Sequence, residues 1–137
     1  MRQKFIIGNW KMKVTSRALA KKLFLAEKKV ANKTQGVQTI ICAPFLYLDM
    51  LSQEVTGHRC VHGAQDVFQE ESGAFTGEIS TSMLNDAGCE YVIVGHSERR
   101  EYFAESPLVI GNKVKRLLEV NITPVLCVDE PYARKQF

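Results

Sequence analysis

Five short apolar runs, separated by helical patterns, constrain the fold of this chain more than any other feature. The runs lie at 5–8, 39–43, 60–64, 91–95 and 123–128, and they are rich in β-branched residues. Their apolar character is mostly continuous rather than alternating, which is typical of parallel strands that are covered on both faces. We therefore expect five parallel β-strands.

Amphipathic helical patterns lie between these runs. A helix is expected after each of the first four strands, with start signals at Ser16 and at the Ser106–Pro107 pair. A shorter helix is expected at 81–87 and should stop at Gly88. The apolar positions expected to face the core are Leu19, Leu23, Ala26 and Val30, then Leu48, Leu51 and Val55, and finally Ile110, Val114 and Leu117.

The resulting β-α-β-α-β-α-β-α-β order allows two α/β architectures, an open doubly wound sheet or a (β/α)8 barrel. A dinucleotide-binding sheet requires a GxGxxG turn after its first strand, but the turn here reads GNWKMK (8–13). No glycine-rich phosphate loop of the Walker type is found either. A barrel instead collects its functional residues at the carboxyl ends of several strands. The loops therefore favour a partial TIM barrel of about five strands and four helices.

Polar residues follow four of the five predicted strands directly, whereas the second strand ends in a structural Ala43-Pro44-Phe45 segment. Because the carboxyl ends of parallel strands meet at one rim, we expect these side chains to converge. The expected rim residues are Asn9, Lys11, Gln65, Asp66, His96, Ser97, Glu98 and Glu130.

The rim chemistry suits an anionic substrate that carries a carbonyl group. A lysine ammonium attracts a phosphate or an enediolate. A histidine at the start of a helical turn faces backbone N–H groups, which favour the neutral ring as a hydrogen-bond donor to oxygen. Each of these residues also has a simpler structural interpretation. Lys11 could be a solvated surface lysine, and His96 could be a structural histidine. Glu98 could form a surface ion pair with Arg99 or Arg100, and Asn9 could be a turn residue.

Composition excludes several other classes of protein. The 137 residues carry 18 basic and 15 acidic side chains, and the basic residues are dispersed, so we expect neither nucleic-acid binding nor membrane binding. No apolar run approaches membrane-spanning length, which makes the cytoplasm the expected location. The four cysteines form no CxxC pair and have no histidine at ligand spacing, so reduced thiols without a metal or other cofactor are expected.

At this point the motifs closely resemble those of the triosephosphate isomerase family. They are FIIGNWKM (5–12), CAPF (42–45), GAQD (63–66), GAFTGEIS (73–80), VIVGHSERR (92–100) and PVLCVDE (124–130). Their order and spacing agree along essentially the whole chain. The resemblance implies residues 1–137 as the N-terminal part of a single TIM-barrel domain.

The resemblance also implies roles for individual residues. Asn9 and Lys11 would bind substrate, His96 would act as the electrophile that moves protons between the substrate oxygens, and Glu98 would lie beside Lys11 and tune the site. The catalytic set is thus expected to be His96, Lys11 and Glu98, acting on a small phosphorylated triose. The GAFTGE segment (73–78) would reach a neighbouring subunit, with interface residues Thr76, Gly77, Glu78 and Arg99.

Other parts of the family's site have no counterpart in the sequence. In the family, the glutamate base and the lid follow the sixth strand, and phosphate-binding backbone groups follow the seventh and eighth. We therefore expect a triosephosphate isomerase sequence whose isolated chain lacks turnover. The alternative is a non-catalytic half-barrel that forms a homo-oligomer or associates with a complementary half. Another phosphate-handling barrel enzyme would not carry GHSERR or GAFTGE.

Overall fold

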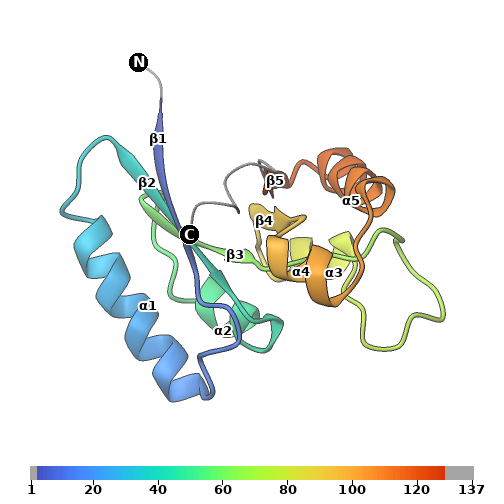
Figure 1. Ribbon diagram of the computed structural model, residues 1–137. Coiled ribbons are helices and arrows are strands. Elements are labelled where there is room, and N and C mark those ends of the chain that lie inside the picture. Colours follow the sequence, from blue (N-terminus) through green and yellow to red (C-terminus); the bar gives the residue numbers. More distant parts are fainter. Residues whose placement is uncertain (1–2, 129–137) are drawn as a thin grey trace.

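A computed structural model, which describes residues 3–128, places the five expected strands in one parallel sheet (Figure 1). The strands lie side by side in sequence order, without the reversal of order that an open doubly wound sheet shows. The predicted partial barrel is therefore confirmed. The strands are β1 (Lys4–Asn9), β2 (Val37–Ala43), β3 (Cys60–Ala64), β4 (Tyr91–Val94) and β5 (Thr123–Leu126).

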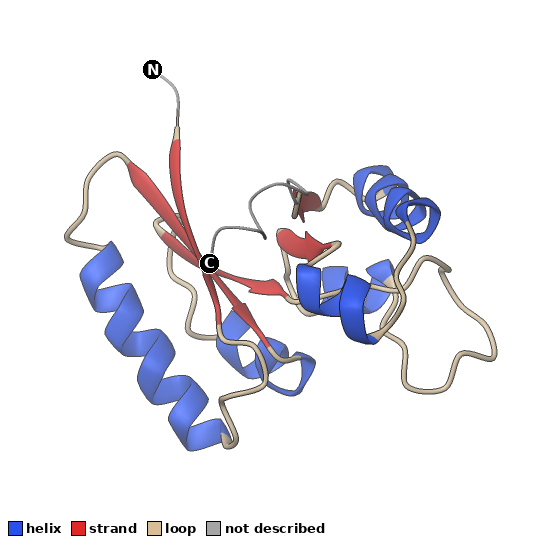
Figure 2. Cartoon of the chain, viewed as in Figure 1, coloured by secondary structure: helices blue, strands red, loops and turns tan. Residues whose placement is uncertain are grey.

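Helices connect consecutive strands. Figure 2 shows α1 and α2 beside β1–β3, and α3–α5 beside β4 and β5. The four expected helices are present, and a short additional helix, α4, lies between β4 and α5. The helices are α1 (Arg17–Ala31), α2 (Leu48–Ser52), which follows a 3-10 turn (Phe45–Tyr47), α3 (Thr81–Asp86), α4 (Ser97–Tyr102) and α5 (Pro107–Glu119). None of these described helices is long and apolar enough to cross a membrane.

Serine side chains cap three of the helices at their N-termini. The hydroxyls of Ser16 and Ser106 accept the backbone N–H of the residue three positions later, as the sequence predicted. Ser80 does the same at the start of α3. Each cap satisfies a backbone donor that has no partner inside the helix, and such a cap stabilises a helix by about 1 kcal/mol.

Alternate residues of the strands pack into two separate apolar clusters. On the helix side, Ile41, Val92 and Val94 pack with helical residues such as Phe24 and Leu117. The opposite face holds a small cluster whose buried members, Ile40, Cys42, Val61 and Ile93, are all strand residues. This alternation follows from the two-residue period of a strand, and it explains why the central runs are apolar throughout.

The predicted core face of α1 was wrong by one residue. Leu19, Ala26 and Val30 were expected to face the core but are exposed, whereas Ala20, Phe24 and Ala31 are buried. Leu23, the fourth predicted residue, does pack against the core. The two stripes are neighbours on the helix surface, so spacing alone does not choose between them. Packing chooses the stripe in which a large Phe24 side chain lies between small alanines.

The expectation that all strands are covered on both faces holds for β3 but not for β1. Every residue of β3 is buried. In β1, Phe5, Ile6 and Ile7 are 47%, 56% and 42% exposed, and the strand pairs only with β2 in the described sheet. β1 is therefore an open apolar edge.

Candidate active site

The carboxyl ends of β1, β3 and β4 bring six of the eight predicted rim residues together around an open cavity of about 550 Å³. Ser97, the first residue of α4, was expected at the rim but does not line this cavity. Asn9 ends β1, and His96 follows β4 after Gly95, whose positive φ of 69° turns the chain into α4. The cavity is lined by Asn9, Lys11, Met12, Lys13, Phe45, Gln65, Asp66, His96, Glu98, Arg99, Tyr102 and Phe103. Glu130, which was also expected at the rim, lies outside the described residues.

Lys11 forms an ion pair across the rim with Glu98. The Lys11 Nζ atom lies 2.6 Å from Glu98 Oε1, and both side chains are nearly half exposed. The hydrogen bond from Lys11 is the largest cause that lowers the pKa of Glu98 below its ordinary value. Near the backbone, the Lys11 N–H donates to Asn9 Oδ1 at 2.9 Å. Lys11 therefore connects the two strand ends that carry Asn9 and Glu98.

The hydrogen bonding of His96 indicates which ring nitrogen faces the site as a donor. His96 caps the N-terminus of α4, and its Nδ1 accepts the backbone N–H of Glu98 at 3.2 Å. Nδ1 also lies 3.4 Å from Glu98 Oε2, a contact that would be an ion pair if the ring were protonated. We favour the neutral ring, because a protonated Nδ1 has no lone pair to accept the Glu98 N–H. The proton then belongs on Nε2, which is the tautomer that can donate to a substrate oxygen.

A set of four charged side chains lies next to this rim, of which three are buried and the fourth, Arg99, is 29% exposed. We call Asp66, Arg99, Glu105 and Lys113 the buried ion set. Asp66 lies 2.7 Å from Lys113 Nζ and 2.9 Å from Arg99 Nε, and Glu105 contacts the same two cations. Burial raises the pKa of Asp66 more than these cations lower it. Burial also tends to raise the pKa of Glu105, but its bonds with Lys113 and Arg99 lower it overall.

Arg99 was expected at a subunit interface, and its side chain makes several contacts within this chain. Its Nε atom pairs with Asp66 and Glu105, and its guanidinium lies 4.6 Å from the centre of the Phe103 ring. In the structure, its described partners thus come from the start of the 65–80 loop, the α4–α5 connection and the end of α4. Its predicted contact with a partner subunit remains a prediction.

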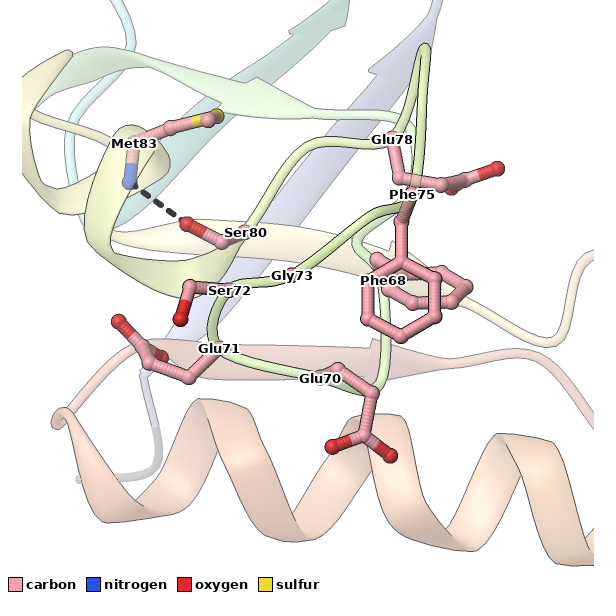
Figure 3. Close-up of a pocket in the computed structure, with 9 residues that line it drawn as sticks. All are labelled: Phe68, Glu70, Glu71, Ser72, Gly73, Phe75, Glu78, Ser80 and Met83. Atoms are coloured by element: carbon pink, nitrogen blue, oxygen red, sulfur yellow. Dashed lines mark hydrogen bonds between the residues drawn. The ribbon is translucent and has the colours of Figure 1, made fainter.

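The other three expected interface residues lie on the long loop from 65 to 80, which projects away from the sheet (Figure 1). Thr76, Gly77 and Glu78 are all exposed. Inside the loop, the rings of Phe68 and Phe75 face one another with centroids 4.6 Å apart, and they line a pocket of about 220 Å³ (Figure 3). This pocket shares no lining residue with the rim cavity.

Hydrogen bonds at its base give the loop a defined shape. The Phe68 N–H donates to the Ile79 carbonyl at 2.8 Å. Glu71 accepts hydrogen bonds from the hydroxyls of Thr81 and Ser82, which lower its pKa. The exposed tip of the loop therefore extends from a base that is held by hydrogen bonds. Compact surface loops of this kind are frequently functional.

Sequence reasoning missed Lys113 in this region and gave no role to Gln65. Gln65 was placed at the rim without a role, but its amide contacts Asn9, Lys11 and Cys42. Lys113 was overlooked, although it lies on the apolar stripe of α5 and is only 3% exposed. A lysine on a buried helical stripe is a signal for a buried carboxylate partner, because an unpaired charge there would be costly.

The parallel strands and the polar residues at their carboxyl ends define a partial (β/α) barrel with a candidate active site at the usual end of such barrels. Comparison with known proteins then shows the family. A family model described as triosephosphate isomerase matches residues 4–137, and the chain belongs to the triosephosphate isomerase family.

Curated relatives agree with this assignment. The chain is 42% identical over 137 residues to a triosephosphate isomerase of Endomicrobium trichonymphae. It is 46% identical over 136 residues to that of Cupriavidus pinatubonensis and 45% identical over 130 residues to that of Dehalococcoides mccartyi. These alignments cover 99%, 99% and 95% of this chain but 54%, 54% and 51% of the relatives. The chain therefore spans about half the length of the curated relatives it matches.

Proposed function

We propose that this chain contributes to the interconversion of glyceraldehyde 3-phosphate and dihydroxyacetone phosphate, the aldose–ketose isomerisation of glycolysis and gluconeogenesis, in the cytoplasm. The observation that carries the proposal is the convergence of Lys11 and His96 on Glu98. Lys11 Nζ lies 2.6 Å from the Glu98 carboxylate, and His96 Nδ1 accepts the Glu98 N–H at 3.2 Å. Membership in the triosephosphate isomerase family supports the same reaction.

In this scheme each rim residue has a separate task. The Lys11 ammonium and the Asn9 amide bind the phosphorylated triose. The Nε2–H of His96 donates to a substrate oxygen and stabilises the negative charge that develops when a neighbouring carbon loses its proton. His96 then moves a proton between the two substrate oxygens. Glu98 holds Lys11 beside the cavity.

The reaction also requires a base that removes a proton from one carbon and returns it to the next. Among the described residues, the carboxylates that line the cavity are Glu98 and Asp66, and each is paired with a cation. We therefore propose that the base comes from a further barrel segment, either on a longer chain or on a separate one. The described rim supplies the electrophile and the substrate-binding residues.

A coupled assay with glyceraldehyde 3-phosphate tests this function. The chain is assayed alone and together with the C-terminal half of the Cupriavidus pinatubonensis enzyme. We expect turnover only in the mixture, and we expect His96→Gln to reduce it by about a hundredfold or more. A mixture that associates, as measured by light scattering, but shows no turnover would refute the proposal. Turnover by the isolated chain, abolished by His96→Ala, would refute the need for a second half.

The open edge of β1 favours a second candidate function, that of a half-barrel module that associates with a second copy or a complementary half. Ile6 is 56% exposed in the middle of an apolar strand with an unpaired side in the described sheet. Such edges tend to pair with another chain. The exposed tip of the 65–80 loop, with Thr76, Gly77 and Glu78, is proposed as a further contact in a homo-oligomer.

Light scattering of the purified chain tests this association. We expect a mass above that of the monomer, and we expect Ile6→Lys to reduce it because a charge on the edge opposes strand pairing. Val30→Lys is the matched control, since Val30 is 67% exposed and lies on α1 rather than on a strand. A monodisperse monomer at micromolar concentration would contradict the module.

A further inference from the structure

The backbone of Lys11 has an unusual conformation. Its φ of 52° is positive, and only two other non-glycine residues in the described part of the chain, Ala104 and Asn121, share this property. In this region the Cβ atom of an L-residue approaches a carbonyl oxygen, which asparagine tolerates better than lysine. Such a conformation persists when surrounding contacts impose it. Contacts from neighbouring groups are therefore expected to hold Lys11 in this conformation.

The side-chain amide of Gln65 supplies these contacts. Its Nε2 lies 3.0 Å from the Lys11 carbonyl oxygen, 3.3 Å from Asn9 Oδ1 and 3.2 Å from the Cys42 carbonyl oxygen. Asn9 Oδ1 in turn accepts the N–H of Lys11 at 2.9 Å. Gln65 thus acts on both peptide groups of Lys11, directly at the carbonyl and through Asn9 at the N–H.

Gln65 is itself held by its chain neighbours. It follows Ala64, the fully buried last residue of β3, and it precedes Asp66, which is 6% exposed. The Asp66 carboxylate contacts Lys113 at 2.7 Å and Arg99 at 2.9 Å. The buried ion set therefore fixes the backbone from which the Gln65 amide reaches β1.

We propose that Gln65 is a positioning residue, which holds Lys11 in its left-handed conformation so that the ammonium group reaches Glu98 and the rim cavity. Gln65 acts through Lys11 and Asn9 and is not a catalytic residue. This role of Gln65 matters for catalysis only if the chain has the proposed isomerase function, so in that respect the inference rests on the proposed function.

The test compares Gln65→Met with the parent chain. Methionine keeps the length of the side chain but removes the N–H donors. The carboxyl group of Glu98 is followed by ¹³C NMR during a pH titration, with its signal assigned by Glu98→Gln. We expect the depression of the Glu98 pKa to become smaller, because the Lys11 hydrogen bond is its largest cause, while the electrostatic effects of His96 and Lys13 remain. We also expect the strong intraresidue amide–Hα NOE of Lys11, a mark of positive φ, to weaken.

Gln69→Met is the matched control. Gln69 lies in the same loop, and its Oε1 accepts a hydrogen bond from Asn112 at 3.3 Å, so this change also removes a side-chain hydrogen bond. Both Lys11 readouts should be unchanged in the control. An unchanged Glu98 pKa and an unchanged NOE in Gln65→Met would overturn the proposal. If Gln65→Met does not fold, Gln65→Asn, whose amide is one methylene too short, is judged by the same two readouts.

Neither readout needs substrate or turnover, so this result is separate from that of the proposed function. The mixture of the two halves could show no turnover while Gln65→Met still changes both Lys11 readouts. In that case the positioning role holds and the isomerase proposal is refuted. If the assay succeeds, Gln65→Met is expected to lower kcat/KM by about a hundredfold, which is typical when a binding group is misplaced by about 1 Å. Turnover with an unchanged Lys11 signal in Gln65→Met would overturn only the positioning role.

Discussion

Two neighbouring groups of charged side chains in this molecule differ sharply in their surroundings. The rim pair of Lys11 and Glu98 has side chains that are 46% and 43% exposed. In the buried ion set, Lys113, Asp66 and Glu105 have side chains that are 3%, 8% and 5% exposed. Both groups join the end of a parallel strand to the segment that follows β4.

The difference indicates that the two groups have different tasks. Water screens the rim pair, so it contributes little to folding, and the ammonium group of Lys11 is accessible for its proposed role in substrate binding. The buried charges interact in a medium of low effective dielectric, and each depends on its partners. Removal of one member of the buried ion set is therefore expected to destabilise the fold, whereas the rim pair stays accessible to solvent.

The largest effect on stability is expected for Lys113→Met. The change leaves Asp66 and Glu105 buried with Arg99 as their shared cation, and loss of one partner from a buried ion pair typically costs about 3–5 kcal/mol. Urea denaturation measures the loss in the free energy of unfolding. Lys115→Met is the matched control, because Lys115 is 76% exposed and should contribute at most about 0.5 kcal/mol. Equal losses of stability in the two variants would contradict the expected structural role of the buried ion set.

The second effect is a loss of stability at acidic pH, which we expect from the buried side chain of His62. Burial lowers the pKa of His62, whose Nε2 contacts the Ala87 carbonyl, and Glu90 is the charged group that opposes this shift. The unfolded chain therefore binds a proton first, below a pH of about 6.5. The free energy of unfolding should decline as pH falls from there, by at most about 1.4 kcal/mol per pH unit from this group.

Variants of two histidines identify the source of this pH dependence. Urea denaturation between neutral pH and pH 5 should show a shallower decline for His62→Gln than for the parent chain. His58→Gln, which replaces an exposed histidine, is the matched control. An identical slope in His62→Gln would show that this histidine is not the group responsible.

The smallest effect on stability is expected for Lys11→Met. Its partner Glu98 is exposed, so the free energy of unfolding should change less than in either experiment above. Isomerase activity of the mixed halves should nevertheless fall by about a hundredfold or more, since Lys11 is the proposed electrostatic group for the substrate. A large loss of stability in Lys11→Met would show that the rim pair is structural after all.

Much of the fold could be predicted from local pattern. Strand positions, helix caps at Ser16 and Ser106, and the stop at Gly88 depend on short stretches of residues and their spacing. Convergence of Asn9, Lys11, His96 and Glu98 was also predictable, because parallel strands place their carboxyl ends at one edge. The face of α1 was not predictable, since two adjacent stripes fit the same period.

The sequence by itself determined the parallel sheet and the composition of the rim, because both follow from local periodicity and from the direction of the strands. Only the tertiary structure decided which charges meet. Lys113 contacts Asp66, 47 positions away, and Gln65 contacts the carbonyl of Lys11, 54 positions away. Such partners are set by the packing of distant segments, since a buried charge or amide bonds whichever group the fold brings within about 3 Å.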